Sequence, residues 1–144
     1  SDKEQLNILL KKLLDTQNFP FSYWVNQEIE KIRNQENTPI DFFPDFLHRG
    51  FYYEQLERYY QFFPVENILV IEHRELKNNR ISTLRKIEQF LNISYVDWNT
   101  INLDDKFVSQ YNVKLPSDIR NKLKAFFKPY NEKFYKLIKR NFDW

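Results

Sequence analysis

The sequence predicts an α/β fold that is mainly helical, with one short buried strand at about residues 67–72. Leucine and aromatic residues recur three and four positions apart in several segments, which is the period of an amphipathic helix. Within residues 67–72, positions 68–71 instead form a continuous apolar run that follows a proline and precedes charged residues, a pattern typical of a strand buried on both faces. Because a helical pattern follows this run, we expect half of a βαβ unit and a parallel sheet.

The helical pattern divides the chain into five segments separated by breaks. The predicted helices cover about residues 6–14, 22–32, 50–63, 79–91 and 117–138. Ser22, Asn79 and Ser117 stand at helix starts, where a polar side chain can accept hydrogen bonds from the first backbone N–H groups. Pro129 lies inside the last helix, which we expect to kink or to split there. Residues 92–116 are predicted to be loop.

The chain has the size and composition of one domain, residues 1–144. It has no repeats or low-complexity linker, and its 14 Phe, 9 Tyr and 3 Trp can form a substantial core. A single buried strand is awkward, because its unpaired backbone groups would be costly in a core. Either something outside this chain completes the sheet, or the strand interpretation is wrong.

Composition excludes several classes of site. The absence of cysteine excludes disulfides, zinc–thiolate sites and cysteine nucleophiles, and His48 and His73 are too few for a histidine-based metal centre without carboxylate help. We therefore predict no metal. No apolar run approaches the roughly 20 residues of a membrane span, and no signal peptide opens the chain. The single glycine, Gly50, excludes a glycine-rich phosphate loop within these residues.

Charge is unevenly distributed along the chain. Residues 106–144 hold 10 Lys/Arg and 3 Asp/Glu, whereas residues 1–105 hold 12 and 17. Such a basic segment can attract phosphate, sulfate or nucleic acid, and it is also what a solvated helix face looks like. The lysines of the last helix scatter around its polar arc with no aromatic residues among them, so we expect no nucleic-acid partner.

Several segments, in their order and spacing, resemble the sulfotransferase family. Residues 50–60 are similar to a family pattern of glycine, aromatic, tyrosine, then leucine and an aromatic pair. Residues 63–72 look like the phenylalanine, short spacer and strand that follow it, and residues 75–91 match its "E-L … T-L-x-x-I-x-x-F-L" helix. Residues 130–144 resemble the family's terminal helix and final tryptophan, and residues 21–29 resemble an earlier family helix.

This resemblance covers about residues 19–144 and is closest to the branch that includes heparan sulfate sulfotransferases. It implies the C-terminal part of a P-loop-like α/β domain. The implied reaction is transfer of a sulfuryl group from 3′-phosphoadenosine 5′-phosphosulfate (PAPS) to a hydroxyl or amine of a carbohydrate or other small molecule. The compartment stays open: it would be the cytoplasm if the protein is bacterial and the Golgi lumen if it is a eukaryotic carbohydrate sulfotransferase.

In the family, the phosphosulfate loop, the 3′-phosphate segment and the usual catalytic base all precede the matched region, and residues 1–18 contain none of them. We therefore expect the isolated chain to be inactive. The remainder of the domain, or another chain, is expected to cover the strand edges. The alternative is a non-catalytic binding or scaffold module derived from the same fold.

The resemblance also points to candidate site residues. In the heparan sulfate branch a late loop places an aromatic side chain near the adenine and basic residues near the 3′-phosphate, and Lys106, Phe107 and Lys114 are its nearest matches here. Phe107 as a core residue and Lys114 as an ordinary surface charge are the alternatives. His48 and Glu54 flank the start of the third helix and could together abstract a hydroxyl proton. A solvent-exposed histidine at a helix start is the alternative.

Overall fold

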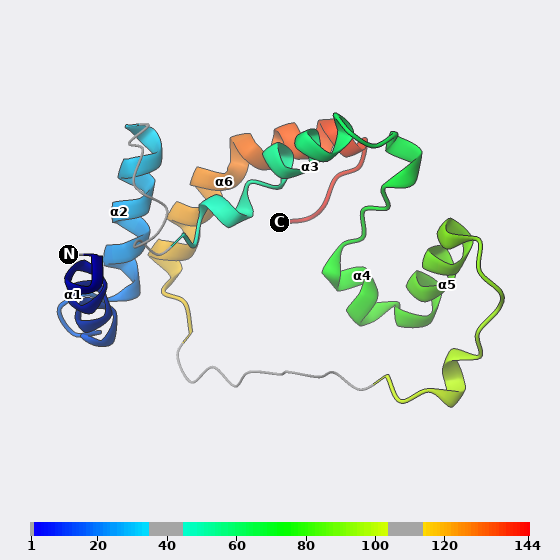
Figure 1. Ribbon diagram of the computed structural model, residues 1–144, viewed down its shortest axis with the longest axis horizontal. Helices are drawn as coiled ribbons and strands as arrows, with labels where there is room; N and C mark the ends of the chain where they lie inside the picture. The colour runs from blue at the N-terminus through cyan, green and yellow to red at the C-terminus, as the bar shows by residue number, and fades with distance from the viewer. Residues whose placement is uncertain (1, 35–44, 104–113) are drawn as a thin grey trace. The chain divides into compact units, whose positions relative to one another are not determined.

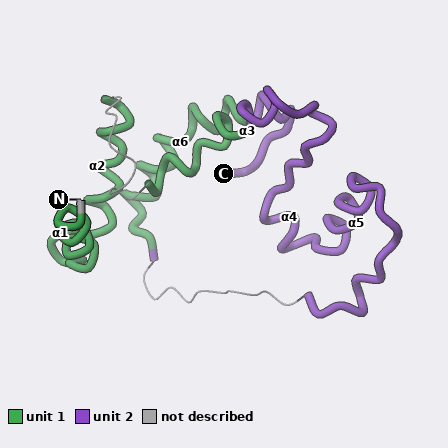
Figure 2. Tube along the Cα trace, in the orientation of Figure 1, with its two compact units in different colours: residues 1–55, 115–134 green, residues 56–114, 135–144 purple. Residues whose placement is uncertain are grey.

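The computed structural model describes residues 2–34, 45–103 and 114–144, and the regular elements of these residues are helices (Figure 1). The α-helices are α1 (Asp2–Leu14), α2 (Phe21–Arg33), α3 (Tyr52–Tyr60), α4 (His73–Asn78), α5 (Arg80–Leu91) and α6 (Ser117–Ile138). Short 3₁₀ turns occur at His48–Gly50, Val65–Asn67 and Trp98–Thr100. The chain divides into a first unit, residues 1–55 and 115–134, and a second unit, residues 56–114 and 135–144 (Figure 2).

The predicted strand at residues 67–72 is wrong, since the described part of the chain contains no strand. The backbone of this segment is extended where its angles are known, with φ −126° and ψ 113° at Ile68 and φ −74° and ψ 134° at Glu72. Leu69 is 38% exposed, which is inconsistent with burial on both faces. An extended segment becomes a strand only when a neighbour pairs with its N–H and C=O groups, and the described residues provide no such neighbour.

The helix boundaries correct several predicted caps. Helix α2 begins at Phe21 after Pro20, whose ring fixes φ at −66°, so Ser22 lies inside the helix. Asn79 does precede α5, but its side chain makes no capping hydrogen bond. Helix α6 includes Ser117 as its first residue, and the N–H of Arg120 donates to the carbonyl oxygen of Pro116 at 2.9 Å. The helix runs past Pro129 without splitting.

The core of the first unit lies between α2, the turn before α3, and α6. Its buried residues are Val25, Ile29, Leu47 and Ile119. Partly buried side chains pack around them: Ile32, Leu115, Leu123, Phe126 and Phe127. An aromatic cluster extends this core, in which the buried Phe51 ring stacks on Tyr130 with centroids 4.1 Å apart and planes 14° apart. The period that predicted α2 and α6 therefore identified their buried faces.

Gly50 owes its identity to close packing rather than to an unusual backbone angle. A Cβ placed on Gly50 would lie 2.8 Å from Cε1 and 2.9 Å from Cζ of Phe127, closer than real Cβ contacts. Its φ is not positive. Gly50 ends the 3₁₀ turn His48–Gly50, and the approach of the Phe127 ring is what excludes a side chain there.

The second unit is organised around α4 and α5. Thr83 is fully buried, and its hydroxyl donates to the carbonyl oxygens of Glu75 at 3.0 Å and Asn79 at 2.9 Å, which joins the two helices. Helix α5 ends at Leu91, and the next residue, Asn92, adopts the left-handed conformation with φ 50°. The guanidinium of Arg80 donates to the carbonyl oxygen of Leu103 and so holds the segment after α5.

Candidate functional site

His48 lies at the start of the 3₁₀ turn before α3, with carboxylates on both sides of its imidazole. Its Nδ1 is 3.8 Å from Oδ1 of Asp45, and its Nε2 is 3.9 Å from Oε2 of Glu54. The ring packs edge-on against Phe51 with centroids 5.4 Å apart, while 61% of the side chain remains exposed. The structure thus brings together the predicted pair of His48 and Glu54, and it adds Asp45. A solvent-accessible imidazole next to carboxylates is a side chain that many enzymes use for acid–base chemistry.

Glu28 is a site residue that sequence analysis missed. Its carboxylate accepts hydrogen bonds from the backbone N–H groups of Phe46 at 3.0 Å, Leu47 at 2.8 Å and His48 at 3.2 Å. The residue is only 4% exposed, and this burial raises the pKa of Glu28 above its ordinary value despite the three hydrogen bonds. One buried carboxylate of α2 therefore fixes the backbone that carries His48.

Lys114 is exposed and lies three residues before α6. No hydrogen bond or ion pair joins its side chain to a residue that the structure describes. The other two predicted donor-site residues, Lys106 and Phe107, lie outside the described residues.

Glu88 is a second buried carboxylate, on α5, that holds a following loop. It accepts from the backbone N–H of Val96 and from Nε1 of Trp98, both at 2.9 Å. Arg85 donates to both of its carboxylate oxygens at 2.8 and 2.6 Å, and this guanidinium lowers the pKa of Glu88. Arg85 also lies 3.8 Å from the centroid of the Tyr95 ring. The loop that precedes the predicted donor residues is thus anchored at its start.

The end of the chain turns back sharply after α6. Lys139 adopts the left-handed conformation with φ 53°, and the N–H of Arg140 donates to the carbonyl oxygen of Tyr135 at 3.1 Å. Phe142 and Trp144 then stack with ring centroids 5.0 Å apart. Tyr135 packs edge-on against both of these rings, so the tail is held by aromatic contacts.

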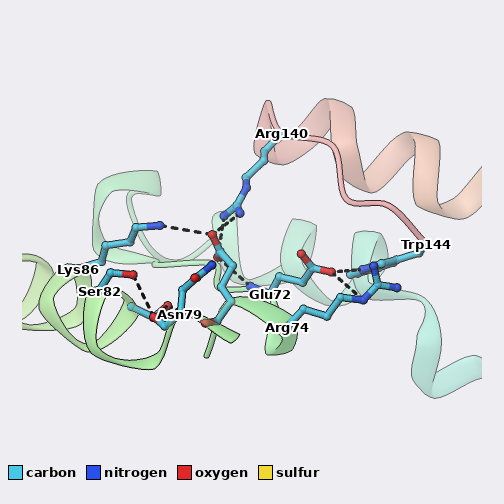
Figure 3. A network of polar contacts seen from close by, with 9 residues as sticks. Glu72, Arg74, Asn79, Ser82, Lys86, Arg140 and Trp144 are labelled. Carbon is cyan, nitrogen blue, oxygen red and sulfur yellow. Dashed lines mark hydrogen bonds and ion pairs between the residues drawn. The ribbon is translucent and has the colours of Figure 1, made fainter. Parts of the chain in front are cut away.

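Polar contacts attach this tail to α4 (Figure 3). Arg140 donates to Glu75 through both Nη atoms, at 3.0 and 2.5 Å, and Lys86 approaches the same carboxylate at 3.3 Å. The Arg140 hydrogen bonds lower the pKa of Glu75 to about 2. The indole Nε1 of Trp144 donates to Glu72 at 3.0 Å. Glu72, the last residue of the predicted strand, therefore accepts a hydrogen bond from Trp144.

A metal site and a membrane-spanning helix are both absent from the residues that the structure describes. No group of three or more His, Asp or Glu side chains is arranged there to hold a metal ion. Each helix in that part of the chain is too short or too polar to cross a bilayer.

Comparison with known proteins identifies the family. The family model for the sulfotransferase domain matches residues 15–103. Membrane-associated sulfotransferase kil1 of Dictyostelium discoideum is 33% identical over 98 residues, which cover 68% of this chain and 20% of that protein. Heparan sulfate glucosamine 3-O-sulfotransferase 5 is 25% identical in Homo sapiens and 24% in Mus musculus, over 65% of this chain and 32% of each relative.

This chain thus spans between a fifth and about a third of the length of those relatives. No solved structure matches it. Sulfotransferase domains have a P-loop-like fold, to which the described helices contribute. Because the family model covers residues 15–103, more than half of the 144 residues, the chain belongs to the sulfotransferase family.

Proposed function

We propose that these residues are part of an enzyme that transfers a sulfuryl group from PAPS to a hydroxyl or amine of a carbohydrate or other small molecule. The observation that carries the proposal is the family match over residues 15–103. Two similar proteins bear names of heparan sulfate sulfotransferases, which supports a carbohydrate acceptor. In such a transfer a bond forms between sulfur and the acceptor oxygen or nitrogen. The bond between sulfur and the donor's phosphate oxygen breaks, and a base takes the acceptor's proton.

Among the described residues, His48 is the side chain best suited to take that proton. Asp45 and Glu54 lie 3.8 and 3.9 Å from its two ring nitrogens. Glu28 holds the His48 backbone and acts through it. On the donor side, the proposal assigns Lys114 to an anionic group of the nucleotide, because a lysine pairs with phosphate as a point charge. Lys106 and Phe107 complete the proposed donor contacts.

We expect Lys114→Ala to weaken binding of 3′-phosphoadenosine 5′-phosphate by about ten- to a hundredfold. The variant removes one hydrogen bond between charged groups, which is worth roughly 1.5–3 kcal/mol. The measurement is calorimetric titration of the nucleotide into a protein that carries the complete sulfotransferase domain. Lys77→Ala, which removes another exposed lysine, is the control and should leave affinity unchanged. If the two variants bind the nucleotide with equal affinity, Lys114 does not contact it.

We expect the 144-residue chain alone to show no turnover of PAPS above background with sugar acceptors. Phosphate-cradling loops need several glycines, and the single Gly50 packs against the Phe127 ring instead. The assay follows transfer of labelled sulfate from PAPS, with a chain extended to the complete domain in parallel. Turnover by the short chain would contradict this prediction. If the extended protein neither binds the nucleotide nor turns over PAPS, the alternative of a non-catalytic binding module is favoured.

A further inference from the structure

Arg140, in the tail that follows α6, begins a series of contacts that runs through the second unit to Leu103. Its guanidinium donates to both carboxylate oxygens of Glu75, at 3.0 and 2.5 Å. The carbonyl oxygen of the same Glu75 accepts from the hydroxyl of Thr83, which is fully buried on α5. Three residues before Thr83, Arg80 donates to the carbonyl oxygen of Leu103. Glu75 thus links the tail to the segment that follows α5.

The contact between Arg140 and Glu75 is more specific than an ordinary surface ion pair. Two N–H groups of the guanidinium meet two carboxylate oxygens, which fixes the relative orientation of the side chains. The Glu75 side chain is only 17% exposed, and Lys86 of α5 approaches the same carboxylate at 3.3 Å (Figure 3). The hydrogen bonds from Arg140 are the main reason that the pKa of Glu75 is lowered to about 2. Arg140 therefore helps to hold α4 and α5 as well as the tail.

The tail is also attached at points that do not involve the guanidinium. Phe142 is buried, packs edge-on against Tyr135 and stacks on Trp144. The indole of Trp144 donates to Glu72 at 3.0 Å. Replacing Arg140 leaves these attachments in place, so its effect on the rest of the unit can be measured in a folded protein.

We propose that Arg140 is a positioning residue for the sulfuryl donor, acting through Glu75 and the first turn of α5 on Leu103. The inference rests on the proposed function, in which the residues that contact the nucleotide begin three positions after Leu103. Three residues of chain span at most about 11 Å, so the position at which Leu103 is held limits where that contact can form. Without the guanidinium, the start of α5 loses one of its fixed points. The competent arrangement is then less populated, which weakens binding although no group that touches the nucleotide has been removed.

The test titrates 3′-phosphoadenosine 5′-phosphate into a protein that carries the complete sulfotransferase domain. We expect Arg140→Gln to bind the nucleotide about three- to tenfold more weakly, as for other residues that act through a packed network. Arg140→Lys keeps the charge but loses the two-point contact, so its affinity should fall between those of Arg140→Gln and the parent. Lys77→Gln removes an equal charge from an exposed position on α4 and is the control, which should bind like the parent.

Hydrogen exchange of the same proteins shows whether the effect reaches Leu103. In Arg140→Gln we expect the backbone amides of residues 80–103 to exchange faster than in Lys77→Gln, at a temperature where both variants are folded. The double variant Arg140→Gln/Glu75→Gln should bind the nucleotide no more weakly than the weaker of the two single variants, because both residues belong to one contact.

Unchanged nucleotide affinity of folded Arg140→Gln would overturn the proposal even if its melting temperature falls, because a purely structural contact changes stability alone. Unchanged hydrogen exchange of residues 80–103 would overturn it as well. If the parent does not bind the nucleotide, both the proposed function and this inference are wrong. If the parent binds it and Arg140→Gln binds equally well, only this inference is wrong.

Discussion

Replacing Glu28 with alanine is expected to lower the free energy of unfolding by about 2–4 kcal/mol. The substitution removes the acceptor of three backbone N–H groups, at Phe46, Leu47 and His48. An unsatisfied buried donor costs about 1–3 kcal/mol, and the Leu47 N–H is the most deeply buried of the three. Urea-induced unfolding followed by circular dichroism measures the loss. Glu30→Ala, an exposed carboxylate on the same helix, is the control and should change stability by less than about 0.5 kcal/mol.

The pH dependence provides a second check on Glu28. Burial raises the pKa of Glu28 in the folded state above the ordinary value of 4.5. Protonation of Glu28 therefore stabilises the folded state, and this contribution is fully present below pH 4.5. That stability is lost as the pH rises through the raised pKa. A Glu28→Gln variant cannot titrate, so the stability advantage of the parent over it should shrink as the pH rises above 4.5. If the stability of the parent relative to Glu28→Gln instead grows with pH, burial does not dominate the pKa of Glu28.

Replacing Phe142 with alanine is expected to cost about 3–5 kcal/mol, as for other buried phenylalanines. The residue is 8% exposed and contacts Tyr135 and Trp144. Arg140 lies 4.8 Å from its ring centroid, so loss of the ring also loosens the guanidinium that binds Glu75.

The chain provides matched controls for this prediction on either side of Phe142. Asn141 and Asp143 are exposed, and their alanine variants should stay within about 0.5 kcal/mol of the parent. Thermal melting and urea unfolding of the three variants make the comparison. If Phe142→Ala is no worse than its neighbours, the tail is not packed as described.

One of the two buried carboxylates left a signal in the sequence that can be recognised in retrospect. Glu28 falls between Val25 and Ile29 on the buried face of α2, whereas Glu88 shares its buried side of α5 with Thr83, and Leu91 is 55% exposed. A glutamate in an apolar stripe is costly unless it is hydrogen-bonded, so its position indicates a buried acceptor. The donors could not be predicted, because those of Glu28 lie 18–20 residues further along the chain.

The incorrect prediction of a strand shows the limit of assigning secondary structure from the composition of one segment. Residues 67–72 have the composition of a buried strand, and the extended angles at Ile68 agree with that preference. Pairing between strands is a property of two segments, and composition describes only one of them. The same run is compatible with an extended connection between α3 and α4, which is how the structure has it.

The sequence by itself determined where α1, α2, α3, α5 and α6 lie, because apolar spacing and prolines act within a few residues of one another, but it did not predict the short helix α4. It also determined the family, since the order of several weak patterns is more specific than any one of them. Only the tertiary structure decided the contacts of Glu75 with Arg140, 65 residues away, and of Glu72 with Trp144, 72 residues away. Such pairs form when packing brings distant segments next to each other. The free energy of that packing comes from many side chains, so neither residue of a pair indicates its partner by itself.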